Sequence, residues 1–374
     1  MSSLFNSFKE EIDKGRAGGN RGLPMGFPRL ETIIPGVQRG TNYLIFGESG
    51  TGKSSFADTV FVCNPLDWYM THKHEIDTKL EIFYYSFEIS KPRLITKLIA
   101  RKIWIDHGIL LDVNYILSKG MKYRISDEHY QICMGYSKYM DEASDFIHIK
   151  DSNSGYNNPT GIYNDLRRHS ELNGKWETIE NQQQYKENNP NLYTIIITDH
   201  LGIVPGEKQQ STKENIDSLC KKQMLLRNSC NYSFVNISQV NRSVNDLKRI
   251  YDYEKESLKL NLGDVKDSGG SVEATDMAIG IVSAKRYDMK THNKYDIAQL
   301  DDRYRSINIA KNRDGDADIS IGLLFLGENG YFQELPRASE MTQSDYEQVD
   351  SYHKHYATVK PEVQGNLDFN IRIS

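Results

Sequence analysis

From residue 42 onward, short apolar runs alternate with segments of helical periodicity. The predicted strands are runs of aliphatic, β-branched and aromatic residues at 42–46, 81–87, 145–150, 193–198, 232–238 and 277–283. Helical patterns separate the first five of them, at 53–63, 91–106, 159–172 and 214–229. Continuous apolar strands bounded by helices are typical of a buried, mostly parallel sheet. The chain is therefore expected to be an α/β protein with a central sheet flanked by helices.

The C-terminal part of the chain follows a different pattern. Two further predicted strands, 305–311 and 318–325, approach each other around a polar turn, which predicts an antiparallel hairpin. Residues 174–192 are polar and rich in glutamine and asparagine, so we expect a surface insertion there. The tail at 336–374 is polar with weak periodicity, and the pattern leaves open how much of it is ordered.

The N-terminal residues 1–21 precede the main predicted domain at 22–335. Residues 4–13 form an amphipathic helical pattern in which Leu4, Phe5, Phe8 and Ile12 share one face. The glycines between 15 and 22 end this helix and predict a flexible joint. An apolar stripe on a tethered helix has to dock, either on its own domain or on a neighbouring subunit.

Composition narrows the class of protein. The 51 acidic and 46 basic residues give a net charge of −5, so any contact with nucleic acid has to come from a few positioned loops. No apolar run approaches the roughly 18–20 residues of a membrane span, and the N-terminus lacks the apolar core of a signal peptide. The four cysteines have no CxxC spacing, which argues against a zinc site and indicates reduced core thiols in a cytoplasmic protein.

The strongest chemical signal follows the first predicted strand. It matches the phosphate-loop pattern G-x-x-x-x-G-K-[ST] in full, with the residues Gly47, Glu48, Ser49, Gly50, Thr51, Gly52, Lys53 and Ser54, followed by Ser55. Glycines let backbone N–H groups curl around phosphate oxygens, and the start of the following helix adds partial positive charge. We expect Lys53 to reach the β- and γ-phosphates of ATP and the Ser54 hydroxyl to ligate Mg²⁺.

Two carboxylates follow other predicted strands. Asp199 ends the apolar run 194–198, where a second Mg²⁺ ligand is expected, although a strand-end Asp can also cap a turn. Glu88 lies at the end of the predicted strand 81–87, which follows the phosphate-loop helix, and is a candidate for activating the attacking water. Its other interpretation is a helix cap before Ser90.

The segment Tyr85-Ser86-Phe87-Glu88-Ile89-Ser90 resembles the S-L-E-M-S motif of DnaB-family replicative helicases, in which the Glu is the catalytic base. Four further segments resemble motifs of that family in the same order, at 22–27 (GLPMGF), 237–243 (ISQVNRS), 264–269 (DVKDSG) and 309–313 (IAKNR). With the phosphate loop, six motifs in order span roughly residues 4–335. The resemblance implies a RecA-like motor in a homo-oligomeric ring, expected to be a hexamer, that hydrolyses ATP and moves 5′→3′ on single-stranded DNA.

The resemblance also implies roles for single residues. Gln239 matches the sensor that contacts the γ-phosphate, although a buried Gln can simply bond a neighbouring strand. Lys311 and Arg313 match a pair that reaches the γ-phosphate of the neighbouring subunit, and the other interpretation is a solvated surface pair.

Two loops are expected to contact DNA, each through few charges. The first is 205–213, with Lys208 and Lys213, and the second is 263–271, with the residues Lys266, Ser268 and Gly269. Backbone N–H groups and one or two lysines per subunit suit phosphate tracking without sequence preference. Each lysine taken alone can equally be solvated surface.

The sequence departs from the family pattern in three places. His200-Leu201-Gly202 replaces Tyr-Leu-Gln, Asp267 replaces Glu with an extra Gly270, and the family's N-terminal collar has no counterpart, which weakens the expectation of primase docking. A helicase loader or primase stays a candidate partner, and the composition suggests a bacteriophage protein in the host cytoplasm. Two other functions stay open: a RecA/RadA-type recombinase or mediator that binds DNA without unwinding it, and a ring ATPase that acts on protein.

Overall fold

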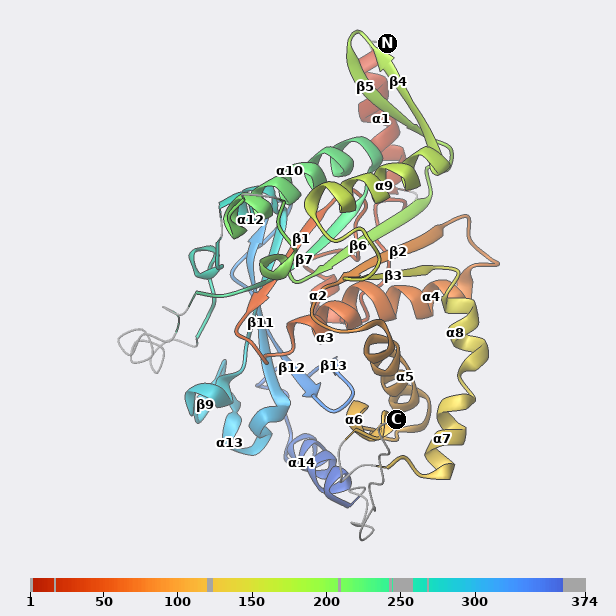
Figure 1. Cartoon of the computed structure of the whole chain (residues 1–374). Helices are drawn as coiled ribbons and strands as arrows, with labels where there is room; N and C mark the ends of the chain where they lie inside the picture. Colours follow the sequence, from red (N-terminus) through yellow and green to blue (C-terminus); the bar gives the residue numbers. More distant parts are fainter. Residues whose placement is uncertain are drawn as a thin grey trace.

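A central sheet of nine strands organises the protein (Figure 1). The computed structural model describes residues 3–16, 18–119, 124–207, 210–241, 244, 258–267 and 269–358. The strand order is β13-β12-β11-β8-β1-β7-β6-β2-β3. The six parallel strands are β1 (Asn42–Gly47), β2 (Lys79–Ser86), β3 (Ile147–Asp151), β6 (Leu192–Asp199), β7 (Ser233–Gln239) and β8 (Met277–Val282). All six coincide with predicted strands, so the expected α/β fold is confirmed.

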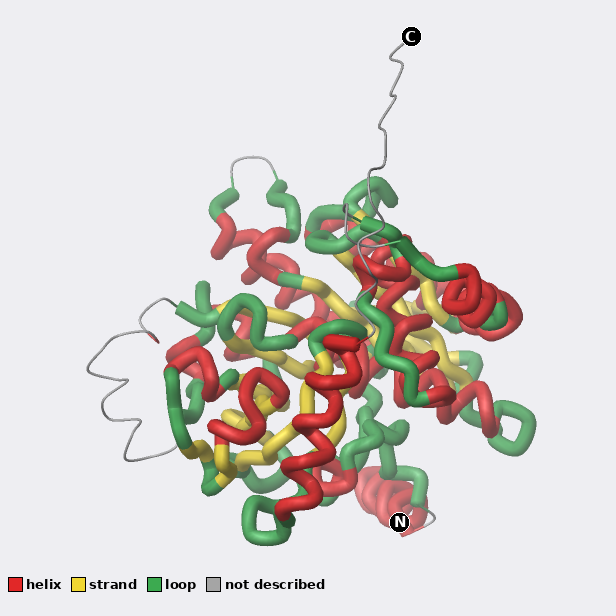
Figure 2. Tube along the Cα trace, turned by 90° about the horizontal axis from the view of Figure 1, so that it is seen from below, coloured by secondary structure: helices red, strands yellow, loops and turns green. Residues whose placement is uncertain are grey.

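Helices cover both faces of the sheet, as Figures 1 and 2 show. On one face lie α9 (Pro159–Asn173), α10 (Thr212–Cys230) and α12 (Gly269–Ala274), and on the other lie α3 (Lys53–Ala57), α4 (Asn64–His72) and α5 (Lys91–His107). Side chains alternate between the two resulting cores: Tyr43 and Ile45 of β1 join one, and Leu44 and Phe46 join the other. A strand buried on both faces must be apolar throughout, which explains the unbroken apolar runs.

The C-terminal hairpin is confirmed and extends the sheet. β11 (Tyr304–Asn312) pairs antiparallel with both β8 and β12 (Ser320–Leu326), and β12 pairs antiparallel with β13 (Tyr331–Glu334). Because β11 runs opposite to β8, its C-terminal end lies beside Met277, at the edge where the parallel strands begin.

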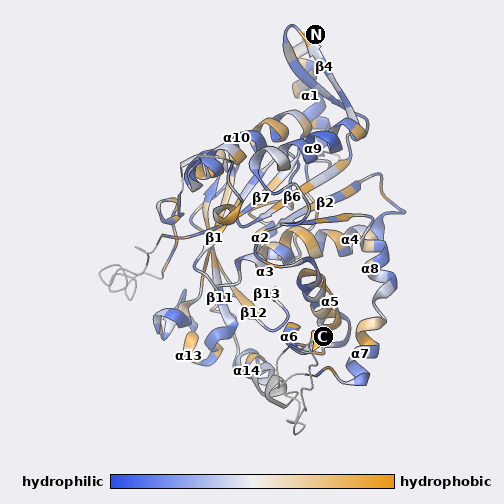
Figure 3. Cartoon of the chain, in the orientation of Figure 1, coloured by the Kyte–Doolittle hydropathy of each residue, from blue (hydrophilic) through white to orange (hydrophobic). Residues whose placement is uncertain are grey.

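The polar segment at 174–192 forms a hairpin of its own outside the central sheet. Its strands are β4 (Gly174–Ile179) and β5 (Gln182–Glu187), and it is mostly hydrophilic (Figure 3). Trp176 anchors it, because the Arg167 guanidinium of α9 lies 3.5 Å from the centre of the indole ring and the indole N–H donates to Ser170. The amphipathic polar–aromatic pattern gave no strand signal, and the sequence predicted only a surface insertion.

Three other segments differ from the sequence expectation. The helix expected at 53–63 continues to residue 72 through a π-helical turn, η1 (Asp58–Cys63), and α4, because Leu66 and Tyr69 carry the buried face onward. The region after α5 holds α6 (Val113–Ile116), α7 (Asp127–Met134) and α8 (Ser137–Ala143), which were not predicted. The tail is partly helical: α14 (Gln343–Thr358) brings Tyr352 against Trp104, with ring centres 5.3 Å apart.

The remaining elements are short. They are α2 (Pro28–Glu31), α13 (Ile297–Leu300), β9 (Thr291–His292), β10 (Tyr295–Asp296) and the 3-10 turns η2 (Leu201–Ile203), η4 (Leu262–Asp264), η5 (Ala284–Tyr287) and η6 (Asp301–Arg303). The four cysteines are buried free thiols. Within the described ranges, no helix combines the length and the apolar character needed to cross a membrane.

The N-terminal helix α1 (Ser3–Arg16) does not bury its apolar stripe on its own chain. Leu4, Phe5, Phe8 and Ile12 have exposed fractions of 82%, 50%, 58% and 44%. The part of the chain that the structure describes therefore leaves this stripe largely exposed, and docking on a neighbouring subunit stays a prediction.

Candidate nucleotide-binding site

The predicted phosphate loop, acids and sensor converge at one edge of the sheet. Parallel strands end at the same edge, and β1, β6 and β7 end at Gly47, Asp199 and Gln239, with Glu88 two residues beyond β2. A hollow of about 150 Å³ is lined by Ser49, Gly50, Gly52, Lys53, Ser54, Ser55, Glu88, Asp199, His200, Ile237 and Gln239. Residues that are far apart in the sequence thus share one small hollow.

The loop conformation requires glycine at two positions. Gly50 and Gly52 have φ of +78° and +94°, in the left-handed region that favours glycine. A Cβ on Gly52 would lie 2.9 Å from a ring carbon of Phe332, and one on Gly47 would lie 2.5 Å from the carbonyl oxygen of Ile281. The loop is therefore tightly enclosed between the sheet and the β12–β13 hairpin.

Lys53 is a buried cation with a backbone partner. Its Nζ donates to the carbonyl oxygen of Glu48 at 2.7 Å, and only 8% of the residue is exposed. Burial lowers the pKa of Lys53 to about 8, although the charges of Asp199 and Glu88 act in the opposite direction. An anionic ligand in the hollow would offset the desolvation of this ammonium group.

Ser54 and Asp199 form a pair of hard oxygen donors facing the hollow. The Ser54 hydroxyl donates to Asp199 Oδ1 at 3.1 Å, and Asp199 is 1% exposed. Burial, followed by the charge of Asp58, raises the pKa of Asp199 to about 6, while the bond from Ser54 acts against this rise. One hydroxyl and one carboxylate fit the way proteins hold Mg²⁺, which takes few protein ligands and fills its shell with phosphate and water oxygens. No cluster of three or more His, Cys, Asp or Glu side chains arranged for a metal occurs among the residues that the structure describes.

His200 belongs to the same hollow, and the sequence analysis assigned it no role there. Its Nδ1 accepts the backbone N–H of Gly202 at 3.2 Å, and its Nε2 lies 3.5 Å from Gln239 Nε2. Burial lowers the pKa of His200, with the Glu88 charge opposing, so the ring is neutral at pH 7. Its position directly after Asp199 was the available sequence signal.

Three further residues hold the phosphate loop and were also missed. Arg305 of β11 donates from Nε to the carbonyl oxygen of Thr51 at 3.0 Å, and Arg286 donates to the carbonyl oxygen of Ser49. The Tyr287 hydroxyl donates to the Glu48 carboxylate at 2.8 Å. Arg305 begins the predicted strand 305–311, in which other polar residues follow it, so no pattern in the sequence indicates its contact with the phosphate loop.

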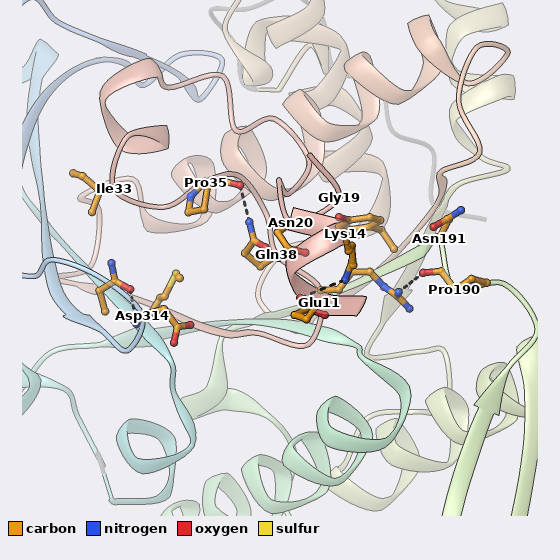
Figure 4. Close-up of a pocket in the computed structure, with 14 residues that line it drawn as sticks. Glu11, Lys14, Gly19, Asn20, Ile33, Pro35, Gln38, Pro190, Asn191 and Asp314 are labelled. Carbon is orange, nitrogen blue, oxygen red and sulfur yellow. Dashed lines mark hydrogen bonds and ion pairs between the residues drawn. The ribbon is translucent and has the colours of Figure 1, made fainter. Parts of the chain in front are cut away.

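Lys311 and Arg313 lie at the opposite edge of the sheet, away from the phosphate loop of their own chain. Lys311 Nζ donates to the carbonyl oxygen of Val272 at 3.0 Å, and Arg313 Nη1 is 2.7 Å from Asp276 Oδ1. A second hollow, of about 550 Å³, adjoins this edge (Figure 4). It lies between Glu11 and Lys14 of α1 and the turn residues Asn312 and Asp314, and it shares no residue with the first hollow.

The two predicted DNA loops lie next to each other. The backbone N–H of Gly270 donates to Asp217 of α10 at 2.8 Å, and a Cβ on Gly269 would lie 3.3 Å from the Lys213 side chain. The N–H of Lys266 donates to the carbonyl oxygen of Gln239 at 2.8 Å, which ties the second loop to the end of β7. Lys208 and Ser268 lie outside the described residues.

Comparisons with known proteins bear on the family and the fold of this chain. The chain shares 28% identity over 108 residues with the replicative DNA helicase DnaB of Nostoc sp. (strain PCC 7120 / SAG 25.82 / UTEX 2576), which is 29% of this chain but only 11% of that relative. A DnaB-like replicative helicase, solved in a study of its interactions with primase, superposes with a TM-score of 0.65 at 21% identity over 90% of this chain and 68% of its own. The ATPase domain of G40P gives a TM-score of 0.65 at 19% identity, covering 90% of this chain and all of that domain. The profile of the DnaB-like helicase C-terminal domain matches residues 22–334, and the chain therefore belongs to that family.

Proposed function

We propose that this chain is the ATP-hydrolysing motor of a ring-shaped helicase, which moves on single-stranded DNA and unwinds duplex DNA in replication. One observation carries the proposal: the side chains of Lys53, Ser54, Glu88, Asp199 and Gln239 line a single hollow at the ends of four parallel strands. A phosphate loop alone would indicate nucleotide binding. Glu88 adds a carboxylate that can activate water, and Gln239 adds an amide that can contact the γ-phosphate, so the hollow also holds the groups that hydrolysis requires.

Each of these groups has a role that its position supports. The loop N–H groups and the Lys53 ammonium neutralise the phosphates, and Ser54 and Asp199 would hold Mg²⁺, which supplies further positive charge to the phosphate oxygens. Glu88 takes a proton from the water whose oxygen attacks the γ-phosphorus, and ADP leaves. Gln239 bonds the γ-phosphate and loses that partner when phosphate departs.

The positions of Lys311 and Arg313 support a site completed between subunits. They lie at the edge where the parallel strands begin, so they cannot serve the phosphate loop of their own chain. In the ring, a head-to-tail contact would bring them to the neighbour's γ-phosphate, where an Arg fork spreads positive charge over the phosphate oxygens.

The link between ATP and DNA follows from the second loop. Lys266 is bonded through its N–H to Gln239, so a shift of Gln239 after hydrolysis would move the loop that carries Lys266 and Gly269. Lys213 and Gly269 lie side by side and would contact the phosphates of the strand together with Lys208 and Ser268. The 5′→3′ polarity, the hexamer and a loader or primase partner rest on the family resemblance alone.

A strand-displacement assay on forked DNA tests this function. We expect ATP-dependent displacement from forks with a 5′ tail, DNA-stimulated hydrolysis, and loss of both in Lys53→Ala. Lys175→Ala, which removes a lysine from the β4–β5 hairpin, serves as the matched control and should behave as the parent. DNA-stimulated hydrolysis without displacement would favour a recombinase or mediator, and hydrolysis that ignores DNA would favour a ring ATPase that acts on protein.

A further inference from the structure

A phenol in the apolar core contacts the proposed metal ligand from behind. Tyr84 of β2 is 1% exposed, and its hydroxyl lies 2.8 Å from Asp58 Oδ1 and 3.3 Å from Asp199 Oδ2. Asp58, in turn, is paired through Oδ2 with Lys97 Nζ of α5 at 2.8 Å. With Ser54 on the other oxygen of Asp199, a continuous polar chain runs from α5 through β2 to the start of the phosphate-loop helix.

This chain of polar groups lies within a hydrophobic core, where apolar side chains are the usual occupants. Tyr84 is surrounded by the core that includes Ile82, Ile195 and Ile197. Burying a phenol and two carboxylates in such a core is unfavourable unless every group has a partner, and here each has at least one. The ring of a phenylalanine would fill the same space, so only the hydroxyl requires a further reason.

The hydroxyl has one proton and two carboxylate acceptors. Asp58 forms an ion pair with Lys97. The hydrogen-bond partners of Asp199 among the described residues are hydroxyl groups, those of Ser54 and Tyr84, and not a lysine or an arginine. The hydroxyl oxygen is closer to Asp58 than to Asp199, so its one proton is shared between the two carboxylates, and the longer contact to Oδ2 restricts the rotation of the Asp199 carboxylate while Oδ1 faces Ser54. Outer groups of this kind orient metal ligands, and removing one typically lowers metal affinity by roughly 10–100-fold.

We propose that Tyr84 is a positioning residue for the metal site, with its hydroxyl holding Asp199 and the Asp58–Lys97 ion pair holding the hydroxyl. The inference rests on the proposed function, because it assigns Tyr84 to the same Mg²⁺–ATP site. Since α5 follows Glu88 directly along the chain, the Lys97–Asp58 pair also ties the helix after Glu88 to the helix after the phosphate loop.

The adjacent residue offers a matched control. Tyr85 is equally buried, and its hydroxyl also donates to a carboxylate, Asp165 Oδ2, at 2.9 Å. Its side chain lies on the other face of the sheet, in the second core. Tyr84→Phe and Tyr85→Phe therefore remove the same group from neighbouring positions, and only the first removes a contact with Asp199.

The test measures binding of a non-hydrolysable ATP analogue to the full chain, in EDTA and across a Mg²⁺ titration, with circular dichroism to check folding. In Tyr84→Phe we expect the half-saturating Mg²⁺ concentration to rise about tenfold, the lower end of the range for loss of an outer-shell partner. Affinity in EDTA should stay within twofold of the parent. Tyr85→Phe should keep the parent's Mg²⁺ dependence even if it unfolds at a lower temperature.

Three results would overturn the inference: an unchanged Mg²⁺ dependence in Tyr84→Phe, an equal loss of affinity with and without Mg²⁺, or the same Mg²⁺ shift in both variants. Nucleotide binding by the parent chain distinguishes a failure of this inference from a failure of the proposed function. If the parent binds no nucleotide, or binds it without regard to Mg²⁺, the proposed function fails and this inference fails with it. If the parent binds normally and Tyr84→Phe matches it, only the role of Tyr84 is wrong.

Discussion

Arg313 is paired with Asp276 of its own chain, with Nη1 and Oδ1 2.7 Å apart. Asp276 is buried and has a second cation, since Arg227 Nη2 lies 3.2 Å from the same oxygen, and its Oδ2 accepts the backbone N–H of Asn42 at 2.9 Å. The Arg313 side chain is 50% exposed. Arg313 can therefore turn away toward another subunit without leaving a buried carboxylate unpaired, because Arg227 stays beside Asp276.

Arg313→Ala should bind ATP as the parent does and lose roughly 10³-fold or more in turnover, the scale of arginine fingers. Its thermal stability should barely change, because Arg227 still pairs with Asp276. Steady-state ATPase and nucleotide-binding assays measure the two effects. Arg337→Ala, at an exposed arginine of the C-terminal region, is the control. Turnover close to that of the parent would show that Arg313 takes no part in hydrolysis.

Subunits with Arg313→Ala and subunits with Lys53→Ala, each inactive alone, should recover part of the ATPase activity when they are mixed. Some interfaces in a mixed ring pair an intact phosphate loop with an intact finger. Native mass spectrometry shows whether mixed rings form. Mixed rings without recovered hydrolysis would rule out an action across the subunit boundary.

Glu88→Gln keeps the shape of the side chain and removes the basic carboxylate. Nucleotide binding and ring formation should be retained, and turnover should fall roughly 10²-fold or more, within the range for loss of a general base. Single-turnover hydrolysis is the measurement, with the exposed Glu75→Gln as the control. Turnover within threefold of the parent would show that another group activates the water.

Replacing both Phe5 and Phe8 by Ser should weaken assembly and leave the folded subunit unchanged. Both rings are about half exposed on α1, so they add little to the stability of their own chain. Burial against a neighbour would contribute about 1.5–3 kcal/mol for each ring, enough to shift assembly in the micromolar range. Analytical ultracentrifugation measures the shift. The control exchanges Lys9 and Asp13, an exposed ion pair on the polar side of α1, for Ser. A lower melting temperature with intact rings would place the stripe on the subunit's own domain.

Asp199→Asn should stabilise the nucleotide-free protein above pH 6. The folded-state pKa of Asp199 is about 6, above its value of 3.8 in the unfolded chain, so the ionised carboxylate destabilises the fold at higher pH. The variant removes this cost, on the order of 3 kcal/mol at pH 8, and its advantage should shrink as the pH falls from 6 toward 4. Thermal unfolding across pH measures it, beside the exposed Asp77→Asn. An advantage that does not vary with pH would have another cause.

The sequence was sufficient to predict the place of those site residues that lie at the end of a strand. The phosphate loop, Glu88, Asp199 and Gln239 each lie at the end of a predicted strand, and parallel strands bring such ends together. Tyr84 and Arg305 could not be assigned in this way, because each lies within a strand, where the residue type alone does not indicate which distant residue it contacts. The partners of Tyr84 lie 26 and 115 residues away, so only the folded chain shows the contact. The β4–β5 hairpin was missed because its strands are mostly polar, and Trp176 and Tyr185, whose ring centres are 5.1 Å apart, give too short a pattern to indicate a strand.

The placement of the phosphate loop at one edge of the sheet and Arg313 at the other has a stoichiometric consequence. If hydrolysis needs both edges, a lone chain has no working site, and an open stack of n chains has n − 1, because its two ends are unmatched. A closed ring has n. Specific activity would then rise with the degree of assembly and reach its full value only on closure. The rate of ATP hydrolysis per chain, measured as a function of protein concentration, would thus indicate how long the open stack is and at what concentration the ring closes.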